Sequence, residues 1–129
     1  MNEHPNAKLA KRIWLAASTG DVEALSDLVA DDVVWHSVGR TPWSGMHRGR
    51  DAVLAFLASI GSSAEIFNSD LRDVLANDER AILLARMTGR RGHKKLDVGY
   101  VLIYEIGEGR VQEIRAIPFD PVAVDEFWG

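Results

Sequence analysis

The chain changes its hydrophobic period near residue 64, and the change predicts helices before that point and strands after it. In the first part, apolar residues recur at every third or fourth position, which places them on one helix face. Helices are predicted for Pro5–Gly20, Asp21–Asp32 and Asp51–Gly61. Asp21 is suited to cap the second helix, and the charge of Asp51 suits the first turn of the third.

The second part alternates apolar and polar positions, as half-buried strands do. One strand, Val33–His36, precedes the third helix, and Asp120-Pro121 is a start signal for a short final helix. The predicted order places helices on one face of a curved sheet, an α+β layout in a single domain covering residues 1–129. Such a layout leaves a cone-shaped cavity where pockets form. The four strands predicted for the second part are Glu65–Leu75, Arg80–Thr88, Leu96–Ile106 and Arg110–Phe119, with a charged loop at 89–95.

The composition and net charge of the chain argue against nucleic-acid and membrane partners. Apolar residues make up 47% and charged residues 26% of the chain, which is typical of a soluble globular protein. The net charge of −4 provides no basic surface for nucleic acid or an anionic membrane. There is no cysteine, no apolar run near the ~20 residues of a membrane span, and no signal-peptide core. We therefore expect a cytoplasmic protein without nucleic-acid or membrane partners.

The segment Val33–Phe56 carries the densest candidate chemistry. It runs from a β-branched strand through a Gly-rich loop into an apolar-faced helix, and includes two Trp, two His and three Arg. This concentration of aromatic and polar side chains is typical of the mouth of a small-molecule pocket.

Three segments carry a resemblance to a known family: Leu25–Trp35, Gly45–Phe56 and Gly109–Asp120. With the order of elements, they resemble the nuclear transport factor 2-like superfamily, in its SnoaL-like, ketosteroid-isomerase-related branch. The resemblance implies a cone-shaped fold, in which a curved mixed sheet wraps around N-terminal helices and an internal pocket. It also implies a homodimer formed through the sheet face. The superfamily includes isomerases, cyclases, epoxide hydrolases, dehydratases and non-catalytic binders, so the fold does not select a reaction.

The catalytic acids of these relatives are missing. The positions where the resemblance places the isomerase residues hold Ser37, Ile13 and Tyr100, of which only Tyr100 suits donation to an oxyanion. Epoxide hydrolases and cyclases of the superfamily keep an Asp after an Arg on the last strand. Here Arg115 is followed by Ala116, which removes that acid.

His36 is the best remaining candidate for a general base, because imidazole titrates near neutral pH. Its alternative role is that of a partly exposed strand residue or loop anchor, since alternation turns either His36 or Ser37 outward. Tyr100 is the candidate for an oxyanion or orienting donor. We therefore predict His36 and Tyr100 as the catalytic pair.

Binding roles are predicted for six further residues, with packing as the alternative for the aromatic ones. Arg86 shares a strand face with Ile82 and Leu84, which predicts that its guanidinium is partly buried. A buried guanidinium needs an anion as partner, and this is either a structural carboxylate or a ligand. No metal site is predicted, because the spacing of His36 and His47 matches no compact metal motif, and no cofactor is expected. The predicted binding residues are Trp14, Trp35, Ser37, Trp43, Tyr104 and Arg86.

Three functions remain open at this point. The first is a cofactor-independent isomerase, cyclase or dehydratase that acts on a hydrophobic metabolite, or an epoxide hydrolase-like enzyme with altered acids. The second is a non-catalytic module that binds a small hydrophobic ligand, which the missing carboxylates favour. The third is an interaction protein whose outer sheet face, where Val101 and Ile103 lie, serves assembly. A homodimer formed through this face is compatible with either of the first two functions.

Overall fold

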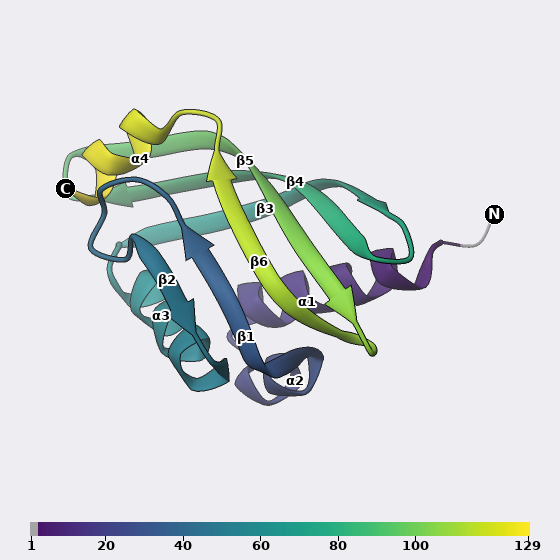
Figure 1. Cartoon of the computed structure of the whole chain (residues 1–129). Helices are drawn as coiled ribbons and strands as arrows, with labels where there is room; N and C mark the ends of the chain where they lie inside the picture. Colours follow the sequence, from purple (N-terminus) through teal and green to yellow (C-terminus); the bar gives the residue numbers. More distant parts are fainter. Residues whose placement is uncertain (1–2) are drawn as a thin grey trace.

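A computed structural model describes residues 3–129 as a curved sheet whose inner face is covered by helices (Figure 1). The capping signals act as predicted. Asp21 accepts a hydrogen bond from the backbone N–H of Ala24 (3.1 Å), and Asp120 accepts one from Ala123 (3.1 Å). The helices are α1 (Pro5–Thr19), α2 (Val22–Leu28), α3 (Arg50–Ser62) and α4 (Pro121–Trp128).

The sheet has six strands in the order β2-β1-β6-β5-β4-β3. β1 and β6 run parallel, and every other neighbouring pair is antiparallel. The predicted α+β fold with a mixed, curved sheet around N-terminal helices is therefore confirmed. The strands are β1 (Val29–Ser37), β2 (Gly45–Arg48), β3 (Ile66–Ala76), β4 (Arg80–Arg91), β5 (Lys94–Gly107) and β6 (Arg110–Pro118).

Three elements differ from the prediction. α2 ends at Leu28 and β1 begins at Val29, so the Asp31-Asp32 pair lies within the strand. The short strand β2 lies in what was predicted to be loop, and pairs along the edge of β1. The predicted charged loop is instead the paired end of the β4–β5 hairpin, where Gly92 turns the chain with a φ of +65°.

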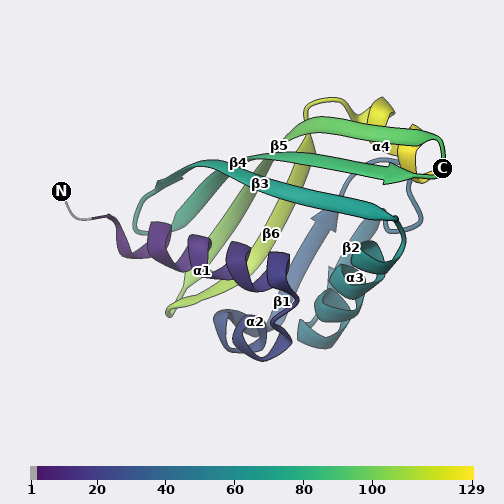
Figure 2. The ribbon, with the colours of Figure 1, turned by 180° about the vertical axis from the view of Figure 1, so that it is seen from behind.

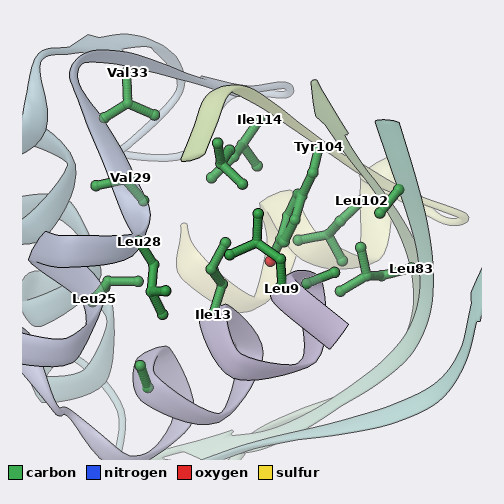
Figure 3. Close-up of a cluster of buried hydrophobic side chains, with 14 of the residues drawn as sticks. Leu9, Ile13, Leu25, Leu28, Val29, Val33, Leu83, Leu102, Tyr104 and Ile114 are labelled. Atoms are coloured by element: carbon green, nitrogen blue, oxygen red, sulfur yellow. The ribbon is translucent and has the colours of Figure 1, made fainter. Parts of the chain in front are cut away.

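The main core lies between α1 and the inner face of the sheet (Figure 3). Leu9, Ala10 and Ile13 are buried on α1, as the three- and four-residue spacing of its apolar positions predicts. At the end of the helix Ala16 is buried, whereas Ala17, which the same spacing places on this face, is exposed. Alternate residues of the strands meet the buried residues of α1, including Leu83 of β4, Leu102 of β5 and Ile114 of β6.

α1, α2 and α3 lie on the same side of the sheet, which Figure 2 shows from behind. α4 lies apart from them, at the end of the sheet where β5 and β6 meet it. No helix within residues 3–129 is long and apolar enough to cross a membrane.

Candidate functional site

A cavity of about 230 Å³ lies between the helices and the inner face of the sheet. Its walls come from all four helices, the loop between β1 and β2, and the inward-facing residues of five strands. Aromatic side chains dominate the lining: Trp14, Trp35, Trp43, Phe56, Phe67, Tyr100, Tyr104 and Trp128.

Two aromatic pairs give these walls their shape. Trp35 of β1 packs edge-on against Phe56 of α3, with ring centroids 5.2 Å apart. Trp43 of the β1–β2 loop meets Trp128 of α4 in the same way, at 4.7 Å. Edge-to-face contacts are a favoured arrangement of aromatic rings, so packing within each pair holds the two tryptophans in place.

A hydrogen bond to the carboxylate of Asp125 holds the loop that carries Trp43 against α4. Asp125 Oδ1 accepts a hydrogen bond from the backbone N–H of Arg40 (2.8 Å). A side chain at Gly39 would collide with that oxygen, because a Cβ there would lie 2.6 Å from it. Glycine at this position, which has a φ of +99°, lets loop and helix approach closely.

The other side of α4 is held by β4. Arg91 donates from Nη1 to the carbonyl oxygens of Phe127 (3.2 Å) and Trp128 (3.0 Å). Carbonyls at the end of a helix lack partners within the helix, so a guanidinium is a favourable cap. Trp128 is thereby fixed in the cavity wall.

No Asp, Glu, Lys, Arg or His among residues 3–129 lines the cavity. Its polar groups are hydroxyls on α1, the sheet and the β1–β2 loop, together with the indole of Trp35. The Nε1 of Trp35 is buried and has no hydrogen-bond partner among the described residues. The hydroxyl-bearing residues are Ser18, Ser37, Thr41, Ser69, Tyr100 and Tyr104.

The two tyrosines are neutral hydroxyl groups at physiological pH. Burial, with a smaller effect of the negative charge of Asp125, raises the pKa of Tyr100 to about 12. Burial alone raises the pKa of Tyr104. Both side chains can therefore donate a hydrogen bond to a ligand, and neither is a base near neutral pH.

His36 lies on the outer face of the sheet, and not at the cavity. Trp35 and Ser37 face inward, so the alternation of β1 turns His36 outward. Its Nε2 lies 2.5 Å from Oε1 of Glu113, which also accepts a hydrogen bond from Arg115 (2.9 Å). The assignment of His36 as the general base of the pocket is corrected by this placement.

Arg86 also lies outside the cavity. Its Nε donates to Oδ1 of Asp97 at 2.6 Å. This contact raises the pKa of Arg86 and lowers the pKa of Asp97. Asp97 is therefore the structural carboxylate that was one of the two partners expected for Arg86. The ligand-binding role predicted for Arg86 is corrected.

The remaining predicted residues come together at the cavity: Trp14, Trp35, Ser37, Trp43, Tyr100 and Tyr104. Four further side chains that the sequence did not predict for the site also line the cavity: Phe56, Phe67, Met87 and Trp128. Phe56 and Trp128 lie on apolar helix faces, and a helical apolar period by itself predicts core packing and not a ligand contact. His47 stacks on Phe56 with ring centroids 4.2 Å apart, and its Nε2 lies 2.7 Å from the carbonyl oxygen of Trp43.

The fold and the cavity define a small-molecule pocket protein of the nuclear transport factor 2-like class. The chain belongs to the SnoaL-like domain family, whose profile matches residues 10–114.

Several proteins are similar to the chain over nearly their full length. Bal32a, from a soil-derived mobile gene cassette, has 36% identity, with 97% of each chain covered and a TM-score of 0.93. A Xanthomonas campestris protein of unknown function with a cystatin-like fold has 28% identity, covering 100% of this chain and 99% of that one, with a TM-score of 0.89. An uncharacterised protein of Mycobacterium tuberculosis is 29% identical, with 99% of each chain covered.

Proposed function

We propose that the protein binds a neutral, flat and largely apolar molecule, and that no ionisable side chain of the cavity acts as acid or base on it near neutral pH. The observation that carries this proposal is the lining of the cavity. Among residues 3–129, its only titratable groups are two tyrosines with raised pKa values. This favours the binding module over acid–base enzymes of the same superfamily.

The size and walls of the cavity indicate the kind of ligand. A cavity of about 150 Å³ lined by aliphatic and aromatic groups takes up benzene. At about 230 Å³, this one suits a system of two fused rings. Aromatic walls favour flat apolar molecules, and the scattered hydroxyls suit orientation of one or two polar atoms. A charged ligand would lose its hydration without gaining a counter-ion.

Catalysis by positioning is the second candidate, and the hydroxyl of Tyr100 favours it. This residue lines the cavity, and burial keeps its hydroxyl protonated. It suits an acceptor oxygen on a bound molecule. An isomerisation or cyclisation that needs only a fixed geometry and one donor is compatible with this lining.

Binding of two matched fluorescent molecules tests the first candidate. Phenylnaphthylamine is neutral, and anilinonaphthalene sulfonate adds a negative charge to the same rings. The neutral compound should bind at least about tenfold more tightly, because desolvation of the sulfonate costs more than the free energy of a tenfold change. His36→Ala should leave the affinity of the neutral compound within about twofold, because His36 lies outside the cavity.

Fluorescence titration measures both dissociation constants. Tighter binding of the sulfonate, or loss of binding in His36→Ala, would contradict the proposal. Trp43→Ala provides the positive control, since it removes one aromatic wall and should weaken binding of the neutral compound.

We also propose that the outer face of the sheet pairs with a second copy of the chain. On this face Val101 lies opposite Ile117, which is 37% exposed, and Ile103 lies opposite Arg115. Phe119, which is 67% exposed, lies beside Gly99 of the same strand as Val101. A cluster of exposed apolar residues favours burial in an assembly. Family resemblance supports a dimer as the form that this assembly takes.

Sedimentation equilibrium at micromolar concentration tests the pairing. The unmodified chain should be a dimer, and Ile117→Glu should shift it to monomer, because each copy would bury an uncompensated charge. Val122→Glu, at an exposed apolar position of α4, is the matched control and should remain dimeric. A monomeric unmodified chain would contradict this proposal.

A further inference from the structure

A surface groove of about 370 Å³ adjoins the cavity between the end of α1, α2 and α3. Its walls are small or apolar over most of their length, with Ala16, Val22, Leu54 and Ala58 among them. Five residues line both the groove and the cavity: Ala17, Ser18, Leu25, Leu57 and Gly61. The cavity and the groove are therefore separated by no more than these side chains.

The groove lies where two helices fail to pack on each other. α1 packs on α2, β3 and β4, whereas α3 packs mainly on β1 and β2. Figure 2 shows both helices on the same side of the sheet, with α2 beyond their near ends. The space between α1 and α3 is thus bounded by helices but not filled by a helix–helix interface.

Gly61 lies on the boundary between the cavity and the groove, and the structure gives no backbone or packing reason for a glycine there. The sequence predicts that it ends α3, but α3 continues to Ser62. Gly61 does not have a positive φ, so its backbone does not require glycine. A Cβ at this position would meet nothing within 4 Å. Glycine in a helix is less favourable than alanine, so neither the backbone nor packing accounts for the missing side chain.

We propose that the cavity and the groove form one elongated site, in which the ligand's ring system fills the cavity and an apolar tail passes between α1 and α3 beside Gly61. This inference rests on the proposed function and extends it to a class of ligand, a neutral ring system with an alkyl chain. The cavity alone, at about 230 Å³, is smaller than most ligand pockets, which span roughly 300–1,000 Å³. With the groove added, the site falls within that range.

N-alkyl naphthylamines of increasing chain length test the inference. In the unmodified protein, each added methylene that enters the groove should raise affinity up to about fourfold, the effect of burying one CH₂ group. In Gly61→Leu, the gain in affinity from the methyl compound to the longer chains should disappear, because the leucine side chain occupies the path of the tail. Gly61→Ala is a second variant that favours the helix, and it should reduce the gain in part.

Ser62→Leu is the matched control, because it adds the same side chain to the next residue of α3, which lines neither space. It should retain the gain with chain length. If the methyl compound binds but longer chains add nothing, or if the gain persists in Gly61→Leu, the elongated site is wrong and the cavity proposal stands. If no naphthylamine binds, both proposals are overturned.

Discussion

Replacing Ala116 by tryptophan should lower the affinity for phenylnaphthylamine at least about 100-fold, while the chain still folds. Ala116 faces inward from β6 and lines the cavity beside the aromatic walls. An indole at this position occupies the volume that the ligand's rings would take. Filling a cavity removes unfilled space from the interior, so we expect little loss of stability from the added apolar group.

Fluorescence titration and a thermal melt of the same samples separate the two effects. Ala116→Leu is a smaller replacement in case the indole overpacks the core, and it should weaken binding to a lesser degree. Leu75→Trp adds an indole at an exposed position of β3 and should leave binding unchanged. Undiminished binding in Ala116→Trp would show that the ligand lies elsewhere.

The secondary structure could be predicted from the hydrophobic pattern of the sequence wherever that pattern extends over many residues. The apolar stripe of α1 and the inward-facing apolar residues at every second position of β5 extend over enough residues to fix both the element and its buried face. The strand β2 was missed because its four residues, Gly45–Arg48, contain no alternation of buried positions. It is a strand because the edge of β1 offers hydrogen-bond partners, and that information is not local.

Only some of the predicted site residues line the cavity, because the errors again concern information that is not local in the sequence. Alternation requires Trp35 and His36 to face opposite sides of β1, but assigning both to the pocket ignored that requirement. The inward face is selected by contacts with distant residues, such as Phe56 for Trp35 and Glu113 for His36. Similarly, Asp97 lies on a different strand from Arg86, so only the register of β4 and β5 reveals the pair.

Stability should depend on positions that do not touch the ligand. Leu83 of β4 is fully buried and does not line the cavity. Leu83→Ala should lower the free energy of unfolding by about 2–5 kcal/mol, because the deleted methyl groups leave a void among packed side chains. Urea denaturation measures this change, which is a large fraction of the roughly 5–15 kcal/mol typical of a domain.

Leu75→Ala makes the same chemical change at a residue that is 54% exposed, and it should shift the unfolding free energy by no more than about 0.5 kcal/mol. Equal effects at the two positions would contradict the placement of the core. Below the unfolding transition, Leu83→Ala should still bind phenylnaphthylamine, whereas Ala116→Trp should be stable and unable to bind. This opposite behaviour is expected because Leu83 is part of the packed core and does not line the cavity, whereas Ala116 lines the cavity. Other core residues of the sheet, such as Leu102 and Ile114, line the cavity as well and would not separate the two effects.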